Sequence, residues 1–218
     1  CSPAELRKMP LCMDRINKVR EYRLASPSAG TIKLAERPTR FHVENMPKGN
    51  YIVVPEVSSQ RRRYIPIGFF TPEIFCSNLV KIIPDATLYH FGILTSNVHM
   101  AWMRVVCGRL KSDYRYSKDI VYNNFPWPLP TEQQKQKIEQ TAQAILDARA
   151  IYPDSSLADL YDELTMPSEL RKAHQQNDKA VMQAYGFDIR TTTESSCVAE
   201  LMKMYQELTE KETARGRK

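Results

Sequence analysis

Basic and aromatic residues alternate along residues 108–128, which read GRLKSDYRYSKDIVYNNFPWP. Cations neutralise phosphates, while planar and short polar side chains reach bases, so this mixture is typical of a nucleic-acid-binding segment. Lys111 and Asp113 are two residues apart and would share one face with Arg115 on an extended backbone. In the DNA major groove Lys can donate to guanine, and Asp can accept from cytosine N4. Taken alone, the spacing favours a surface salt bridge over base contact.

A run of three arginines, Arg61–Arg63, provides a second set of candidate contacts. Guanidinium groups bind phosphate through paired hydrogen bonds, and the hydroxyls of two nearby serines can add donors. A solvated hairpin tip is the alternative interpretation, but the basic surroundings favour phosphate contact. The predicted phosphate contacts are Ser58, Ser59, Arg61, Arg62, Arg63, Arg109 and Lys118, and the predicted base contacts are Lys111, Asp113 and Arg115.

Positive charge is concentrated in the first part of the 218-residue chain, whose net charge is +6. Residues 1–130 hold 19 Lys and Arg against 10 Asp and Glu, a net charge of +9. Residues 131–218 hold 12 against 15, a net charge of −3. We therefore expect an anionic partner to bind the first part.

The motifs of several enzyme classes are missing. The seven glycines are too widely spaced for a phosphate-binding loop, and there is no HExxH or Gly-x-Ser-x-Gly sequence. The five cysteines are scattered, which predicts free thiols in a cytoplasmic protein and no metal site. No apolar run is long enough to cross a bilayer, so no membrane contact is expected. The start, Cys1-Ser2-Pro3, resembles the beginning of a piece of a longer protein.

Helical patterns are predicted at both ends of the chain and short strands in the middle. The first part has a capping box at Ser2–Glu5, an amphipathic helix at 12–23, a loop at 25–30, strands at 51–54, 64–67 and 86–90, a helix at 96–106, and an extended segment at 111–122. Prolines 126, 128 and 130 form a stiff connector. Helices capped by Thr131, started by Pro167 and capped by Ser196 then predict a small helical bundle.

Four segments carry a resemblance to a known family. They are PTRF at 38–41, VSSQRRRYIPIG at 57–68, YHFGILTS at 89–96 with HMAW at 99–102, and residues 108–128, and the similarity continues through 158–162 and 166–167. In these residues the chain resembles the C-terminal part of the MmeI-like (type IIL) restriction–modification enzymes. Those enzymes join an endonuclease, an adenine methyltransferase and a target-recognition domain in one polypeptide.

The resemblance implies an α+β fold: a mixed α/β DNA target-recognition domain over residues 1–129, followed by a small all-α helical bundle over residues 130–218. It places the methyltransferase and nuclease motifs upstream, so this chain would not be an enzyme by itself. S-adenosylmethionine and Mg²⁺ would bind the parent enzyme, and no cofactor would bind here. In the family a charged pair in the stretch matching residues 111–113 helps set one recognised base pair. That favours Lys111 and Asp113 as base readers.

The expected function is therefore sequence-specific recognition of duplex DNA, as one part of a type II restriction–modification enzyme. Its partners would be double-stranded DNA and the upstream methyltransferase and endonuclease domains. Two alternatives from other classes remain: a protein-interaction module of a DNA-modifying complex, and an enzyme with an unrecognised site. DNA affinity that does not fall with salt would favour the interaction module.

Overall fold

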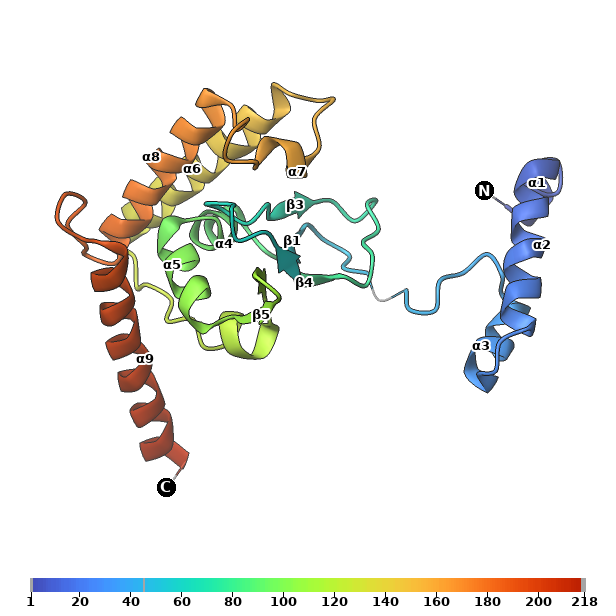
Figure 1. Cartoon of the computed structure of the whole chain (residues 1–218), viewed down its shortest axis with the longest axis horizontal. Helices are drawn as coiled ribbons and strands as arrows, with labels where there is room; N and C mark the ends of the chain where they lie inside the picture. Colours follow the sequence, from blue (N-terminus) through green and yellow to red (C-terminus); the bar gives the residue numbers. More distant parts are fainter. Residues whose placement is uncertain (1, 45, 217–218) are drawn as a thin grey trace. The chain divides into compact units, whose positions relative to one another are not determined.

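The computed structural model describes residues 2–44 and 46–216, and the chain divides into two compact units, residues 1–46 and 47–218. Helices form the first unit (Figure 1): α1 (Pro3–Leu6), α2 (Pro10–Leu24), α3 (Ala29–Lys33) and η1 (Leu34–Glu36). The predicted capping box is present, because Ser2 N–H donates to Glu5 Oε2 (2.7 Å) and Glu5 N–H donates to Ser2 Oγ (3.3 Å). Helix α3 begins inside the segment predicted as a loop.

Polar contacts hold the first unit together. Arg23, near the end of α2, donates to three backbone carbonyls: those of Leu34 (2.9 Å), Arg37 (2.8 Å) and Arg40 (2.7 Å). These hydrogen bonds fasten the segment after α3 onto α2. Helix α2 itself buries no side chain. Its predicted apolar face is therefore only partly covered: Met13 and Ile16 are half-buried, whereas Val19 is exposed.

Two small antiparallel sheets form the start of the second unit. The first sheet has the strand order β3-β1-β4, and the second has the order β2-β6-β5. Their strands are β1 (Tyr51–Pro55), β2 (Val57–Ser58), β3 (Gly68–Phe70), β4 (Val80–Pro84), β5 (Gly108–Leu110) and β6 (Asp113–Arg115). Strand β1 is central, since Ile52 lies opposite Phe69 on one side and Ile83 on the other. The four residues 51–54 are buried, so β1 carries the core of this sheet.

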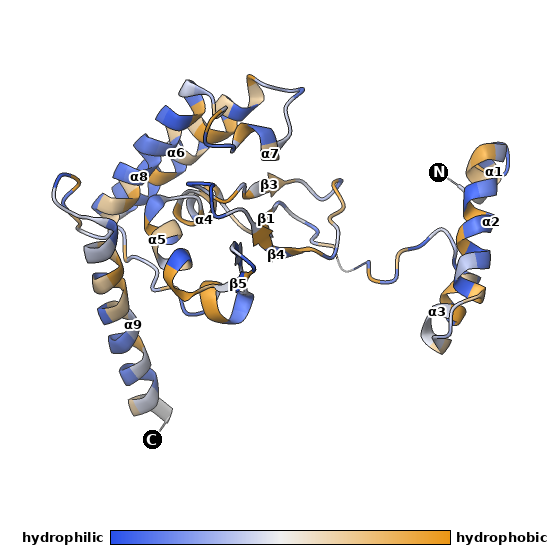
Figure 2. Cartoon of the chain, viewed as in Figure 1, coloured by the Kyte–Doolittle hydropathy of each residue, from blue (hydrophilic) through white to orange (hydrophobic). Residues whose placement is uncertain are grey.

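Helices cover the sheets and complete the second unit. They are α4 (Leu88–Leu94), α5 (Asn97–Val106), the short π-helical turn η2 (Lys118–Tyr122), α6 (Glu132–Ala150), α7 (Leu157–Leu160), α8 (Ser168–Ala184) and α9 (Glu194–Gly216). Helices α6 and α8 lie side by side, and α9 packs against α5 (Figure 1). Hydrophobic residues line β1, while hydrophilic ones cover much of α6 and α8 (Figure 2). No helix of the described residues combines the length and apolar character needed to cross a membrane.

One core runs through the whole second unit, across the predicted domain boundary at residue 129. A Cβ atom at Gly92 of α4 would lie 2.6 Å from Ile138 Cγ2 of α6, so only glycine permits this close approach. Asn177 of α8 donates from Nδ2 to the Gly92 carbonyl (2.7 Å), and Thr141 Oγ1 donates to Asn177 Oδ1 (3.0 Å). The helical part thus packs directly on the mixed part.

The predicted fold class is confirmed: a mixed α+β region is followed by a helical region. Strand 51–54, helix 96–106, the Thr131 capping box and the helix after Pro167 are also confirmed. The strand predicted at 64–67 is wrong, since that segment has no ladder partner and the strand begins at Gly68. Residues 86–90 are not a strand either, because a reciprocal cap between Thr87 and His90 starts α4 there. The division into domains 1–129 and 130–218 stays a prediction.

Two further expectations about the helical part are corrected. Ser196 does not cap the last helix: Thr193 does, and the Thr193 N–H donates to Ser196 Oγ (2.9 Å) while Ser196 N–H donates to Thr193 Oγ1 (3.2 Å). Helix α9 belongs to the helical region, but it packs chiefly on α5 of the mixed part. Its buried residues are Cys197 and Leu201, whereas Leu208 is exposed.

Candidate nucleic-acid interface

Residues 108–115 form a two-stranded hairpin, which differs from the single extended segment expected for 111–122. Strands β5 and β6 pair with Leu110 opposite Asp113, so Lys111 and Ser112 are the turn. Lys111 has a φ of 56°, a conformation that glycine adopts more readily than lysine. Both turn residues are exposed. The hairpin therefore projects a lysine from its tip, at a turn position that is strained for this side chain.

The faces of β6 separate polar from aromatic residues as the spacing predicts. Tyr114 and Tyr116 are buried, while Arg115 is exposed and Asp113 is half-buried. The Tyr116 hydroxyl lies 3.0 Å from His99 Nε2, and burial lowers the pKa of His99 to about 3, so the imidazole is neutral. Both tyrosines are therefore core residues. They anchor the strand whose other face carries the candidate base readers.

The arginine loop, defined as residues 59–63, lies beside the hairpin. Strand β2 pairs with β6, which places Ser58 opposite Tyr114 and starts the loop at the hairpin. The Gln60 N–H donates to Asp113 Oδ1 at 3.3 Å, a contact across 53 positions of sequence. A polar hollow of about 400 Å³ is shared by loop residues Ser59 to Arg62 and hairpin residues Ser112 and Asp113. The two predicted contact sets therefore form one surface.

Members of the arginine loop differ in how they are held. Arg61 and Arg63 are exposed, and Arg62 is half-buried and donates from Nη2 to the Ala158 carbonyl (3.4 Å). The Arg63 guanidinium lies 5.6 Å from the ring centre of Tyr64. The phosphate contact predicted for Ser58 is not supported by the structure. Ser58 is only 3% exposed, so its hydroxyl presents no surface to a phosphate.

The other two predicted phosphate contacts, Arg109 and Lys118, are exposed but lie in different places. The Arg109 guanidinium covers the Tyr114 ring at 4.2 Å, and its Nη1 donates to the Ser112 carbonyl (3.2 Å), which fixes it along the hairpin. Lys118 begins η2 and lies 3.5 Å from Asp119. A separate hollow of about 520 Å³ is lined by Lys118 and Arg115. Arg115 of the hairpin therefore also borders the hollow near η2.

Sequence patterns did not indicate several residues of the site. The hollow beside Asp113 is closed by Asp162 and Glu163, which belong to the helical part. Arg104 of α5 donates to the Arg63 carbonyl (2.5 Å) and so restrains the backbone of the arginine loop. Arg104 and the adjacent pair Asp162 and Glu163 lie far from residues 59–63 in the sequence, and only the tertiary fold brings them to the loop. In the described residues, 2–44 and 46–216, no three His, Cys, Asp or Glu side chains are grouped to hold a metal ion.

Comparisons with known proteins agree with this arrangement. The family model "MmeI, target recognition domain" matches residues 1–129, and "MmeI, C-terminal domain" matches residues 130–212. DNA methyltransferase A of Bacillus subtilis (strain 168) is 40% identical over 207 residues, which are 95% of this chain and 23% of that protein. A solved structure of the type IIL restriction–modification enzyme MmeI in complex with DNA is 48% identical, with a TM-score of 0.82, and matches 96% of this chain and 28% of that one.

The chain therefore spans about a quarter of the length of these relatives. Within that span, the match is continuous through both the mixed region and the helical region. The resemblance inferred from the sequence is confirmed, and the chain belongs to the MmeI family, in which it comprises the target recognition domain and the C-terminal domain.

Proposed function

We propose that this chain recognises a specific sequence in duplex DNA, as the target-recognition part of a type II restriction–modification enzyme. One observation carries the proposal: the β5–β6 hairpin and the arginine loop, far apart in sequence, are joined by strand pairing and by the Gln60–Asp113 hydrogen bond. The MmeI relative of known structure was solved in complex with DNA. A two-stranded ribbon with an exposed basic tip also fits the major groove of B-DNA.

The proposed mechanism divides contacts by their chemistry. Arg61, Arg62 and Arg63 contact phosphates and fix the register of the duplex. Such contacts position the protein but carry no information about the bases. Lys111 and Asp113 contact base edges from the hairpin tip, where Lys donates to guanine and Asp accepts from cytosine. The buried tyrosines of β6 hold the hairpin in place. Arg115 joins the base contacts from the same face of β6.

The catalytic steps belong, on this proposal, to the rest of the parent protein. That protein would be an adenine-N6 DNA methyltransferase with a fused endonuclease, as the resemblance to the MmeI-like enzymes implies. S-adenosylmethionine and Mg²⁺ would bind its upstream domains, as the resemblance to the MmeI-like enzymes implies. It would extrude the target adenine into its own pocket. The parent would act in the cytoplasm, with no membrane contact.

An exchange of the two base readers tests the proposal. In the full-length parent, Lys111→Glu combined with Asp113→Arg reverses donor and acceptor at the hairpin tip. We expect one position of the methylated sequence to change, because each good base contact contributes about 1–3 kcal/mol of discrimination. Mapping methylated sites in genomic DNA measures the result. An unchanged recognition sequence would contradict base reading by this pair.

The exposed pair Lys118 and Asp119 offers a matched control, since it has the same charges outside the hairpin. Lys118→Glu with Asp119→Arg should weaken DNA binding and leave the methylated sequence unchanged. The salt dependence of DNA affinity distinguishes the proposed function from a protein-interaction module. Phosphate contacts impose a linear fall of log affinity with log salt, whereas a protein-interaction module would show no such slope with DNA.

A further inference from the structure

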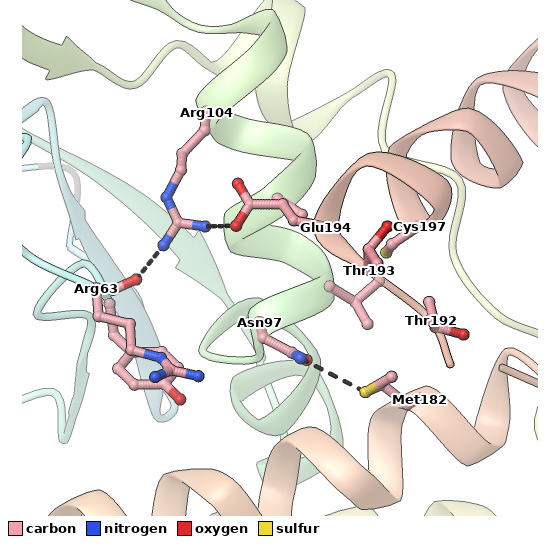
Figure 3. A pocket seen from close by; sticks show the side chains of 11 residues that line it. Arg63, Asn97, Arg104, Met182, Thr192, Thr193, Glu194 and Cys197 are labelled. Atoms are coloured by element: carbon pink, nitrogen blue, oxygen red, sulfur yellow. Dashed lines mark hydrogen bonds and ion pairs between the residues drawn. The ribbon is translucent and has the colours of Figure 1, made fainter. Parts of the chain in front are cut away.

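Arg104 of α5 connects the arginine loop to the start of α9. Its Nη2 donates to the backbone carbonyl of Arg63 (2.5 Å), and its Nη1 donates to Glu194 Oε2 (3.0 Å), as Figure 3 shows. The Arg104 side chain is 19% exposed, so the guanidinium is largely withdrawn from solvent, whereas Glu194 is 56% exposed. The planar fork of arginine suits this task, because it directs two donors along fixed lines.

Glu194 holds Arg104 from a well-fixed position. It is the first residue of α9, and the reciprocal bonds between Thr193 and Ser196 fix the helix start. A carboxylate is favoured there by the partial positive charge of the helix N-terminus. The ion pair therefore orients the guanidinium toward the arginine loop.

Packing alone does not fix the loop on this side. A cavity of about 390 Å³ lies between Arg63, Arg104, Asn97, Met182 and the segment before α9 (Figure 3). A segment that borders an open pocket of this size faces solvent there, and no packed side chains fix its position. On this side, the hydrogen bond from Arg104 therefore restrains the Arg63 backbone.

We propose that Arg104 is a positioning residue for DNA binding. It sets the backbone at Arg63 and thereby the direction of the arginine loop toward phosphate, while Glu194 keeps Arg104 in place. The inference rests on the proposed function, since it concerns how the DNA-contacting loop is held. It also gives the helical C-terminal part a role in DNA affinity, through the first residue of α9.

Three variants of the full-length parent test the proposal. Arg104→Met removes both hydrogen bonds. The exchange Arg104→Glu with Glu194→Arg keeps the net charge and restores an ion pair, but its glutamate at 104 cannot donate to the Arg63 carbonyl. Glu194→Gln keeps Arg104 and an oxygen acceptor. DNA affinity is measured over a range of salt concentrations with a duplex holding the methylated sequence and one lacking it, and Tm is measured without DNA.

Arg104→Met and the exchange should each weaken binding to both duplexes by about tenfold, the loss expected for one charge-assisted hydrogen bond. Both should also reduce the salt slope, and the exchange should remain folded with a slightly lower Tm, since arginine replaces the favoured carboxylate at the start of α9. Glu194→Gln should bind within about twofold of wild type, since both the donor to Arg63 and an oxygen acceptor that holds Arg104 remain. Restored affinity in the exchange would overturn the proposal, and so would wild-type affinity in folded Arg104→Met. A wild-type protein without a salt slope would instead refute the proposed DNA function itself.

Discussion

At the scale of single residues, the proposed function gives Asp113 two roles that conflict. As the proposed base reader it would face the duplex, yet its Oδ1 accepts from the Gln60 N–H and so links the hairpin to the arginine loop. On that proposal, a substitution at position 113 would also disturb the arginine loop, and base readout and general DNA affinity would be coupled through one carboxylate.

Substitutions at Asp113 can separate these roles. Asp113→Asn keeps an oxygen that accepts from Gln60, so it should change discrimination at one base pair and leave affinity for unrelated duplex DNA within about twofold. Asp113→Ala removes the acceptor and should weaken binding to every sequence by several-fold, roughly the effect of one hydrogen bond. Gln60→Ala is the control, because it keeps the backbone N–H. Competition binding with matched and unrelated duplexes decides the matter: equal general affinity in the Asn and Ala variants would exclude the anchoring role.

The sequence indicated some of the residues of this site but not how they meet. The shared face predicted for Asp113 and Arg115 is present, and Tyr114 and Tyr116 lie on the buried face, whereas Lys111 lies in the turn. The turn at Lys111 was missed because neither Lys111 nor Ser112 is a residue that favours a positive φ. Burial of Ser58 was missed for a different reason: pairing with β6, a non-local contact, covers it.

At the scale of elements, the close approach of α4 and α6 depends on Gly92. A methyl group there would lie 2.6 Å from Ile138 Cγ2 and 3.2 Å from Ala142 Cβ, both in the middle of α6. Neither neighbour is a flexible side-chain end that can move away. The helices would have to separate, and the hydrogen bond from Asn177 to the Gly92 carbonyl would lengthen with them.

Gly92→Ala should therefore lower the free energy of unfolding by about 1–3 kcal/mol, the usual cost of overpacking a core. Adding Ile138→Leu removes the Cγ2 branch and should recover part of that loss. Gly108→Ala is a suitable control, because its Cβ would meet Arg115 Cβ only at 4.0 Å. Urea unfolding measures all four proteins. Equal stability of Gly92→Ala and wild type would show that the helices adjust without cost.

Elements with a local sequence signal were predictable, and elements whose position depends on tertiary packing were not. Local signals were reliable: the reciprocal caps at Ser2 and Thr131 and the proline at 167 marked helix starts correctly. The segment 86–90 looked like a strand because its residues are aromatic and aliphatic, yet the cap at Thr87 decides for a helix. The position of α9 on α5 could not be predicted, since it depends on tertiary packing.

At the scale of the whole molecule, a buried carboxylate joins the two matched regions. Asp178 of α8 is 5% exposed, accepts from the Tyr64 hydroxyl (2.6 Å) and accepts from the Asn97 N–H (2.7 Å). Desolvation raises the pKa of Asp178 from 3.8 to about 6, although both hydrogen bonds oppose the shift. The folded protein therefore binds a proton at Asp178 more strongly than the unfolded chain does.

The sign of the resulting pH dependence follows from linkage. Because the folded pKa is the higher one, the stabilisation from a protonated Asp178 is complete below about pH 4 and is lost as the pH rises through about 6. Over that window wild type should lose on the order of 2 to 3 kcal/mol relative to Asp178→Asn, whose amide keeps an acceptor for Asn97 and cannot ionise. Urea unfolding of both proteins between pH 4 and 7 measures the difference. If the stabilities of both proteins instead changed with pH in parallel, the Asp178 carboxylate would be ionised over this range. The hydrogen bonds from Tyr64 and Asn97 would then compensate for its desolvation.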